Sequence, residues 1–171
     1  MAKKPRRIEP QLVKGMRTQL GAPIRRRADM IARIRSVYER FGFQPLETPV
    51  VEFEQTLTGA KAGETGQRIF TWHHDEDDAH LGLRFDLTVP LARFVAANPH
   101  LRRPFKRYQT GPVFRVDKPG PGRFREFVQF DIDTVGTNSM LADAEILVAM
   151  GQVLSELGLP AYTIRWNHRG V

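Results

Sequence analysis

The chain has 171 residues, of which 41% are hydrophobic and 26% charged, and it contains no cysteine. This length is enough for one domain with a hydrophobic core and too short for two full-sized domains. The absence of cysteine excludes disulfide bonds and thiolate metal sites. The five histidines show no ligand spacing, so we expect no metal site.

A surplus of 26 Lys and Arg over 19 Asp and Glu gives a net charge of +7. Two explanations fit this charge: a field that attracts polyanions such as nucleic acid or nucleotide phosphates, or a merely basic surface. No apolar run approaches the roughly 18 residues of a transmembrane helix. The basic start also lacks the apolar segment of a secretory signal. We therefore expect a cytoplasmic protein without a membrane partner.

The first half of the chain predicts an arm, a helix and a strand. Residues 1–27 are rich in Arg and Lys with interspersed Gly and Pro, and we expect an extended or partly disordered arm. Apolar residues recur at helical spacing from Met30 to Phe41, and Gly42 ends the predicted helix. The segment FQPLETPVVEF that follows predicts a strand, which its prolines place at a sheet edge or an interface. Residues 58–67 are expected to form a loop.

Two short strands, 69–72 and 81–85, are expected around the acidic segment HHDEDDAH, which we interpret as a solvated turn without a function. A helix is predicted over 88–97, with Thr88 as its N-cap. Strand character over 107–117 and 123–135, on both sides of the turn KPGPG, predicts a β-hairpin.

The last third of the chain predicts a helix and a strand. The helix begins at Asn138 or Ser139 as N-cap and ends before Gly158 and Pro160, and the segment AYTIRW predicts the strand. The chain combines helices with antiparallel strands and lacks a βαβ rhythm. This organisation favours an α+β fold.

The second strand of the hairpin has two different faces, because alternate residues of a strand share a face. The even positions from Phe124 to Thr134 are mostly apolar and predict a core face. A solvated surface is the alternative for the odd face, but such surfaces rarely combine two arginines, a Phe and an amide beside a Gly/Pro turn. The odd positions are Arg123, Arg125, Phe127, Gln129, Asp131 and Asp133.

The cross-strand register follows if the turn is symmetrical about Gly120. Like charges that face each other destabilise a sheet. Arg115 and Arg125 therefore predict an anion between their guanidinium groups, and phosphate suits the planar fork of Arg. The expected pairs are Arg115 with Arg125, Asp117 with Arg123, Val113 with Phe127, and Gly111 with Gln129.

The same face offers positions for a nucleotide joined to an amino acid. Phe127, opposite Val113, presents an apolar surface for a stacked base, and Gly111 permits close approach of a ligand to the backbone. Gln129 and Asp133 are placed to receive a small polar or cationic group. Successive residues of one face lie about 6.6 Å apart, so the face is long enough for such a ligand.

Several segments, in order along the chain, carry a resemblance to a known family. Phe114 to Asp117, a Gly/Pro loop and Arg123 to Phe127 resemble motif 2 of class II aminoacyl-tRNA synthetases. Within that class, GPVFR, KPGPGRFREF and QFDIDTVG resemble the histidyl-tRNA synthetase family. KGMR resembles its opening signature, GFQPLETPVVE resembles motif 1, LRFDLTVPLARF resembles its amino-acid-binding segment, and NHR near the end also fits. The resemblance implies a class II antiparallel sheet flanked by helices.

The resemblance also implies roles for individual residues. Arg115 is implied to be the catalytic residue, which holds the α-phosphate of ATP and the carboxylate oxygen while histidyl-adenylate forms. Mg²⁺ accompanies the phosphates, and tRNA(His) then takes the acyl group. Helix capping is the alternative for Asp86 and Thr88. Histidine binding is assigned to Asp86, Leu87, Thr88, Arg115, Gln129 and Asp133, and ATP binding to Arg115, Asp117, Arg123, Arg125 and Phe127 with its ring on adenine.

Two departures from the family pattern bear on function. Asp117 stands where motif 2 usually has Glu, which shortens the reach toward adenine. The family's second histidine-specific segment and motif 3 do not occur in the sequence. Residues 28–171 are therefore expected to be the first part of a catalytic domain behind the arm, weak or inactive alone as a ligase. The motif 1 segment implies a homodimer.

Two other functions remain open. The synthetase-like regulatory subunit of ATP phosphoribosyltransferase shares the fold and motif 1 but has no need for the full arginine set, which therefore favours the enzyme. A basic RNA-binding module would carry aromatic platforms or cationic stripes, and only Phe127 is well placed as a platform.

Overall fold

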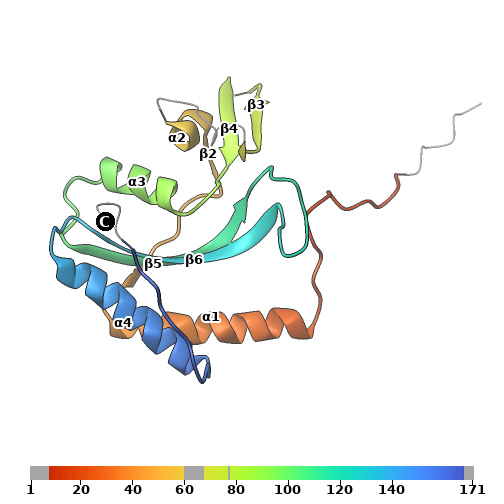
Figure 1. The fold of residues 1–171 in the computed structure, drawn as a ribbon. Coiled ribbons are helices and arrows are strands. Elements are labelled where there is room, and N and C mark those ends of the chain that lie inside the picture. Colours follow the sequence, from red (N-terminus) through yellow and green to blue (C-terminus); the bar gives the residue numbers. More distant parts are fainter. Residues whose placement is uncertain (1–7, 60–67, 77, 168–171) are drawn as a thin grey trace, which may run out of the picture.

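The computed structural model describes residues 8–59, 68–76 and 78–167, and this part of the chain has an α+β fold (Figure 1). The long hairpin of β5 (Phe105–Phe114) and β6 (Glu126–Val135) forms the centre. Figure 1 shows α1 (Ala22–Arg40) and α4 (Met140–Glu156) below this hairpin, and α3 (Thr88–Ala97) above it. The predicted fold class is confirmed.

The main sheet has the order β1-β5-β6, with β1 (Gln44–Pro45) parallel to β5 at its edge. The antiparallel register of β5 and β6 is the one expected from a turn about Gly120, since Val113 pairs with Phe127 and Gly111 pairs with Gln129. Regular pairing ends where Phe114 faces Glu126. All odd positions of both strands thus share the face toward α3.

The hydrophobic core lies between the even face of the hairpin and two helices. Helix α1 contributes Val37 and Tyr38, which lie among Phe43 and Tyr108, and the partly buried Phe130 packs against them. Helix α4 adds Ala149 and Val153, and Ile132 of β6 also packs on this cluster. Burial of these side chains fixes which face of the hairpin is turned inward, because a shift by one residue would reverse it.

A second sheet stands beside the loop end of the hairpin and has the order β2-β4-β3. Its strands are β2 (Val51–Phe53), β3 (Thr71–His74) and β4 (Ala79–Leu83), all antiparallel. The buried Glu52 of β2 forms an ion pair with Arg93 of α3, with Nε and Oε2 2.7 Å apart. The Pro-marked segment supplies β1, at an edge of the main sheet, and β2, at an edge of the second sheet. This agrees with the predicted edge position.

Several element boundaries differ from the predictions. Helix α1 begins at Ala22, so the predicted arm to residue 27 is too long, and Pro23 lies in the first helical turn where its missing N–H costs nothing. The short helix α2 (Glu54–Thr58) was not predicted. The predicted strand AYTIRW is wrong, because residues 161–167 contain no helix or strand. Most of the predicted loop, 60–67, lies outside the described residues.

Within the described ranges, no helix is both long and apolar enough to cross a membrane. The same ranges contain no group of three His, Cys, Asp or Glu residues that could hold a metal ion.

Candidate functional site

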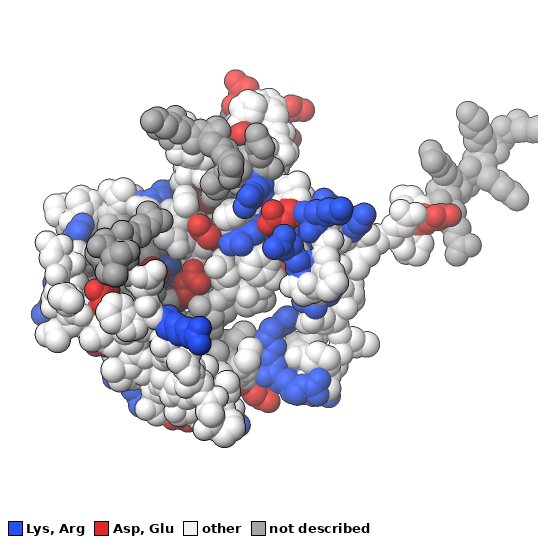
Figure 2. All heavy atoms as spheres, in the orientation of Figure 1, with Lys and Arg blue, Asp and Glu red and all other residues white. Residues whose placement is uncertain are grey.

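A cavity of about 490 Å³ opens at the loop end of the hairpin. Its volume lies within the roughly 300–1,000 Å³ of small-molecule sites. Its lining combines three arginines and two aromatic rings with one carboxylate, an arrangement that favours an anion with a flat ring. Figure 2 shows basic side chains gathered on this face near the hairpin loop. The lining residues are Arg68, Arg115, Asp117, Gly122, Arg123, Phe124 and Phe127.

Arg115 is held between two aromatic side chains of the cavity region. Its guanidinium carbon lies 4.2 Å from the ring centroid of Phe85 and 5.0 Å from that of Phe127. Its Nε also donates a hydrogen bond of 3.3 Å to the carbonyl oxygen of Phe85. Cation–π contacts and one hydrogen bond therefore orient the guanidinium without neutralising its charge. A site prepared in this way favours a negatively charged ligand group.

The structure separates the two arginines that the register places opposite each other. The backbones pair as expected, since Arg115 N–H donates to the carbonyl oxygen of Arg125 at 2.9 Å. The Arg125 side chain, however, donates from Nε to the Asp117 carbonyl oxygen at 3.2 Å and from Nη1 to the Lys14 carbonyl oxygen at 3.5 Å. Arg115 shares the cavity with Arg123 rather than with Arg125. The expected anion between Arg115 and Arg125 is therefore not supported.

The turn itself explains this difference. Beyond Phe114 and Glu126 the chain leaves the ladder, and Gly120 forms an isolated bridge with Arg123. The predicted pairing of Asp117 with Arg123 is therefore wrong. Asp117 instead lies 3.9 Å from Nε of Arg68, measured from its Oδ1. Arg68 was missed by the sequence reasoning, because it precedes β3 and no local pattern links it to the hairpin.

A buried ion pair lies at the other end of the same hairpin face. Arg107 is 0% exposed, and its Nη2 lies 2.6 Å from Oδ2 of Asp133 and 3.2 Å from the carbonyl oxygen of Leu87, to which it donates. Burial lowers the pKa of Arg107, although the charges of Asp133, Asp131 and Asp86 oppose this shift. The sequence reasoning missed Arg107, yet the register about Gly120 pairs it with Asp133 and could have found it.

The carboxyl groups at this end are also perturbed. Burial raises the pKa of Asp131 and of Asp133, while Arg107 opposes both shifts. The charge of Asp86 raises both further, which shows that Asp86 is electrostatically coupled to them. Three acidic groups around one guanidinium suit a ligand that brings its own positive charge.

Four side chains on this face have buried polar atoms without a geometrically regular hydrogen bond in the described part of the chain. They are Nε and Nη1 of Arg107, Oε1 of Gln109, Oε1 of Gln129 and Oδ2 of Asp133, whose contact with Arg107 is the ion pair described above. Buried polar atoms in folded proteins nearly always have partners. A polar ligand beside Gln129 and Asp133 would supply such partners, in agreement with the predicted small polar or cationic group.

Asp86 performs the capping role that the sequence reasoning gave to Thr88. Its Oδ1 accepts hydrogen bonds from the backbone N–H of Thr88 at 3.1 Å and of Val89 at 2.9 Å. Helix α3 begins at Thr88, whose own side chain makes no cap, so that part of the prediction is wrong. Leu87 is fully buried, and its contribution to this end of the face is the carbonyl oxygen that accepts a hydrogen bond from Arg107, rather than its side chain.

Gly111 makes room for a neighbouring side chain, whereas the prediction was that it permits close approach of a ligand. A Cβ at this position would collide with the guanidinium of Arg84. Arg84 is 3% exposed and donates to the carbonyl oxygens of Pro112 at 2.9 Å and Thr48 at 2.8 Å. Burial lowers its pKa. The glycine therefore accommodates a structural arginine rather than a ligand.

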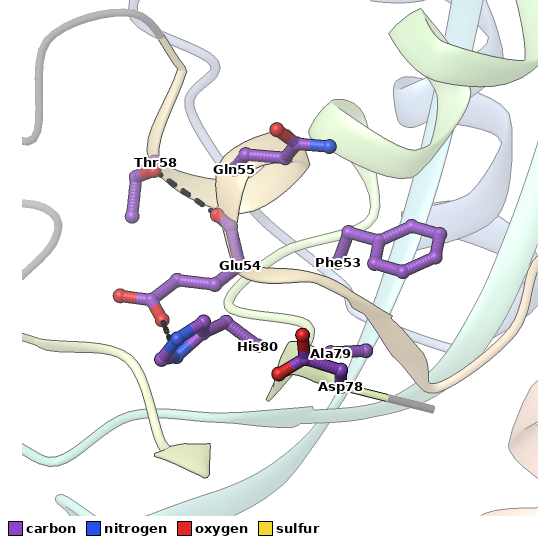
Figure 3. A pocket seen from close by; sticks show the side chains of 7 residues that line it. All are labelled: Phe53, Glu54, Gln55, Thr58, Asp78, Ala79 and His80. Carbon is purple, nitrogen blue, oxygen red and sulfur yellow. Dashed lines mark hydrogen bonds and ion pairs between the residues drawn. The ribbon is translucent and has the colours of Figure 1, made fainter. Parts of the chain in front are cut away.

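A second cavity, of about 480 Å³, lies in the smaller sheet and contrasts with the first (Figure 3). Glu54 faces His80 there, with Oε2 and Nδ1 3.7 Å apart, and Thr58 donates to the Glu54 carbonyl oxygen at 3.0 Å. None of its lining residues in the described part of the chain is an arginine or lysine, whereas the hairpin cavity has three arginines. The hairpin cavity is therefore the nucleotide candidate.

Comparison with known proteins identifies the family. A family model for histidyl-tRNA synthetase matches residues 15–171. The chain belongs to the histidyl-tRNA synthetase family. A histidine–tRNA ligase from Rhodopirellula baltica is 43% identical over 96% of this chain and 37% of the relative. A histidine–tRNA ligase from Rhizobium meliloti is 44% identical over 99% of this chain and 34% of the relative. The chain thus spans about a third of the length of these relatives.

Solved structures of the family have the same fold. Histidyl-tRNA synthetase from a Nostoc species superposes with a TM-score of 0.73 at 34% identity, over 85% of this chain and 34% of that chain. A Bacillus halodurans protein described as an ATP phosphoribosyltransferase regulatory subunit/histidyl-tRNA synthetase has a TM-score of 0.76 at 25% identity, over 92% of this chain and 40% of that chain. The predicted class II fold is confirmed.

Proposed function

We propose that this chain forms the ATP- and histidine-binding part of a histidine–tRNA ligase catalytic domain. The observation that carries the proposal is one hairpin face with Arg115, Arg123 and Phe127 around a cavity at the loop end and acidic and amide groups at the other end. Family membership supplies the reaction. The two ends match a nucleotide and an amino acid with its ammonium group, which the enzyme joins.

For ATP, Arg115 is proposed to bind the α-phosphate and Phe127 to stack on adenine. Arg123 binds the remaining phosphates, and Asp117 faces the adenine side. Arg125, which donates to the Asp117 carbonyl oxygen, serves ATP by fixing the loop rather than by direct contact. Planar guanidinium groups suit phosphate because they donate two parallel hydrogen bonds.

For histidine, Gln129 and Asp133 are proposed to bind polar groups of the substrate. Asp86 attracts the ammonium group while it caps α3, and Leu87 and Thr88 shape the neighbouring wall. Asp86 and the pair Asp131 and Asp133 place negative charge around this end, and the buried Oε1 of Gln129 has no hydrogen-bond partner among the described residues. These features support binding of an amino acid with a positive charge.

The proposed reaction needs no protein nucleophile. A carboxylate oxygen of histidine attacks the α-phosphorus, the bond from that phosphorus to the bridging oxygen breaks, and pyrophosphate leaves. Arg115 contributes by holding both reactants and by stabilising the charge that develops at phosphorus. The tRNA(His) 3′ end then takes the acyl group from histidyl-adenylate.

Mg²⁺ is proposed to accompany ATP and to neutralise phosphate charge. The cavity offers one carboxylate, Asp117, and the described ranges contain no group of three metal-binding side chains. Magnesium at nucleotide sites is commonly held by one or two carboxylates together with substrate phosphates. Because Asp117 is assigned to the adenine side and lies 3.9 Å from Nε of Arg68, the phosphates of ATP are proposed to be the main ligands of Mg²⁺.

The remaining parts of the proposal concern the assembly. A homodimer through the motif 1 segment and a cytoplasmic location are expected of the family. We further propose that these 171 residues alone are weak or inactive as a ligase, because they span about a third of the relatives. Robust histidine-dependent exchange of pyrophosphate into ATP by the isolated chain would overturn this last point.

Isothermal titration calorimetry of the chain with ATP, histidine and a non-hydrolysable histidyl-adenylate mimic tests the proposal. We expect binding of all three, with the mimic tightest because it occupies both ends of the face. Gln129→Ala should weaken histidine and the mimic but leave ATP unchanged. Absence of binding of both ATP and the mimic would refute the proposed site.

The regulatory-subunit function is the second candidate, because the Bacillus halodurans neighbour carries both descriptions. It predicts histidine binding without ATP binding at the hairpin cavity. The higher identity to histidine–tRNA ligases and the presence of Arg115 and Arg123 in one cavity favour the enzyme. The same titration separates the two functions.

A further inference from the structure

The N-terminal segment Lys14–Arg17 lies against the hairpin loop, far from it in sequence. Figure 1 shows this part of the chain passing beside the loop between β5 and β6. The backbone N–H of Arg125 donates to the carbonyl oxygen of Gly15 at 2.8 Å. The guanidinium carbon of Arg17 lies 3.3 Å from the ring centroid of Phe124. One backbone bond and one cation–π contact thus join the segment to the start of β6.

Gly15 is required for this contact in two ways. Its φ of +86° belongs to the left-handed region, which residues with a side chain rarely adopt. A Cβ at this position would also lie 2.8 Å from Cγ of Pro119 and 2.9 Å from Cγ of Arg125. The first of these neighbours is a ring held in the loop, so it cannot move aside as a flexible side chain end can. Any side chain at position 15 would therefore push the segment away from the loop.

Two sets of contacts connect this segment to residues that line the hairpin cavity. Phe124, on which Arg17 lies, is itself part of the cavity wall. Arg125, whose backbone N–H donates to Gly15, also donates from Nε to the carbonyl oxygen of Asp117, another residue of the wall. The segment therefore contacts the residues just before β6 directly and reaches Asp117, beyond the end of β5, through Arg125, although it does not line the cavity.

The hairpin loop needs such support because few backbone hydrogen bonds of its own hold it together. Between Asp117 and Arg123 it consists of Lys, Pro and Gly, and its backbone bonds run between Gly120 and Arg123, at 3.1 Å and 2.9 Å. Regular pairing of the strands stops before it. Contact from a distant segment reduces the conformational freedom of the free loop, so the loop loses less freedom when a ligand binds.

We propose that Lys14–Arg17 is a clamp that positions the hairpin loop for a nucleotide, so that docking of the clamp and binding of ATP favour each other. This proposal rests on the proposed nucleotide site. Gly15, Arg17 and Arg125 are positioning residues, since they act through Phe124 and Asp117. Coupling of two binding events is reciprocal, so ATP must stabilise the docked clamp as much as the clamp stabilises bound ATP.

The test compares Gly15→Ala with Gly21→Ala in the full 171-residue chain. Gly21 has a similar positive φ of +76° but no atom within 4 Å of its Cβ position, so it controls for backbone strain alone. We expect Gly15→Ala to accelerate amide exchange at Arg125 and to weaken ATP binding about fivefold or more, within the usual range of coupling. Histidine affinity should stay unchanged, and Gly21→Ala should leave ATP affinity and exchange at Arg125 unchanged.

Arg17→Gln provides an independent variant, because it removes the contact with Phe124 without straining the backbone. It should weaken ATP binding in the same direction. In the wild-type chain, ATP should slow amide exchange at Arg125 and slow cleavage by trypsin after Lys14 and Arg17. Equal ATP affinity in the wild-type chain, Gly15→Ala and Arg17→Gln would overturn the clamp while the proposed function stands. A wild-type chain that binds no ATP would overturn both.

Discussion

Replacement of Arg107 by Met tests whether the buried end of the hairpin face is organised as an ion pair. Met has similar length and apolar volume but leaves the Asp133 carboxylate without its partner at 2.6 Å. Removing one member of a buried pair costs about 3–5 kcal/mol. The Asp133 side chain is 28% exposed, so water reaches part of it, and we expect about 3 kcal/mol, near the lower limit. Arg107 itself is 0% exposed.

The double replacement Arg107→Met with Asp133→Asn removes both charges and supplies the second half of the test. Because an isolated charge no longer remains, we expect a free energy of unfolding within about 1 kcal/mol of the wild-type value. Urea unfolding at pH 7, followed by circular dichroism, measures the wild-type chain, Arg107→Met, Asp133→Asn and the double variant. A cost below about 1 kcal/mol for Arg107→Met, or costs that simply add in the double variant, would refute the ion-pair reasoning.

Three other predictions concern helix capping, a buried carboxyl group and the proposed adenine site. Asp86→Ala removes the side-chain cap of α3 and Ser139→Ala removes that of α4, so each should cost about 1 kcal/mol of stability. Only Asp86→Ala should weaken histidine binding in calorimetry. Equal histidine affinities of the two variants would contradict the binding role of Asp86. Burial raises the pKa of Asp131 above its ordinary 3.8, so the folded state loses stability as pH rises from that value through the raised pKa and the carboxyl group ionises. Asp131→Asn should therefore raise the thermal unfolding temperature at pH 7 and not at pH 3. A lower unfolding temperature of this variant at pH 7 would contradict the direction of the pKa shift. Phe127→Ala should weaken ATP binding by about 1–3 kcal/mol and Phe127→Leu by less, as expected for a stacked base; equal affinity for all three proteins would exclude stacking.

The hairpin was predictable because its two faces differ in chemistry. The apolar even positions of β6 specify the side that packs on α1 and α4, and this choice also specifies the side that carries Gln129 and Asp133. The register followed from a turn centred on Gly120, and the observed ladder from Phe105 to Phe114 follows it, whereas the predicted pair of Asp117 with Arg123 beyond the ladder does not form. Arg107 follows from the same reasoning, since it faces Asp133 in that register.

Other features depend on contacts that local sequence patterns cannot show. The side chain of Arg125 turns toward Lys14 because a distant segment supplies a carbonyl oxygen there. Arg68 reaches the cavity from the second sheet. Helix α2 has only five residues, too few for a periodic pattern. The segment AYTIRW has strand propensity, but a strand also requires a partner with which to pair, and propensity alone does not supply one.

Calorimetric titration of ATP into the wild-type chain, Arg115→Ala and Arg115→Lys tests the central claim most directly. If the hairpin cavity is the nucleotide site, the wild-type chain binds ATP and Arg115→Ala loses about tenfold in affinity or more, equivalent to about 1.4 kcal/mol. Arg115→Lys should lose less but should not restore binding, because an ammonium group cannot replace the planar fork of Arg. Equal ATP affinity of Arg115→Ala and the wild-type chain would contradict the proposed site.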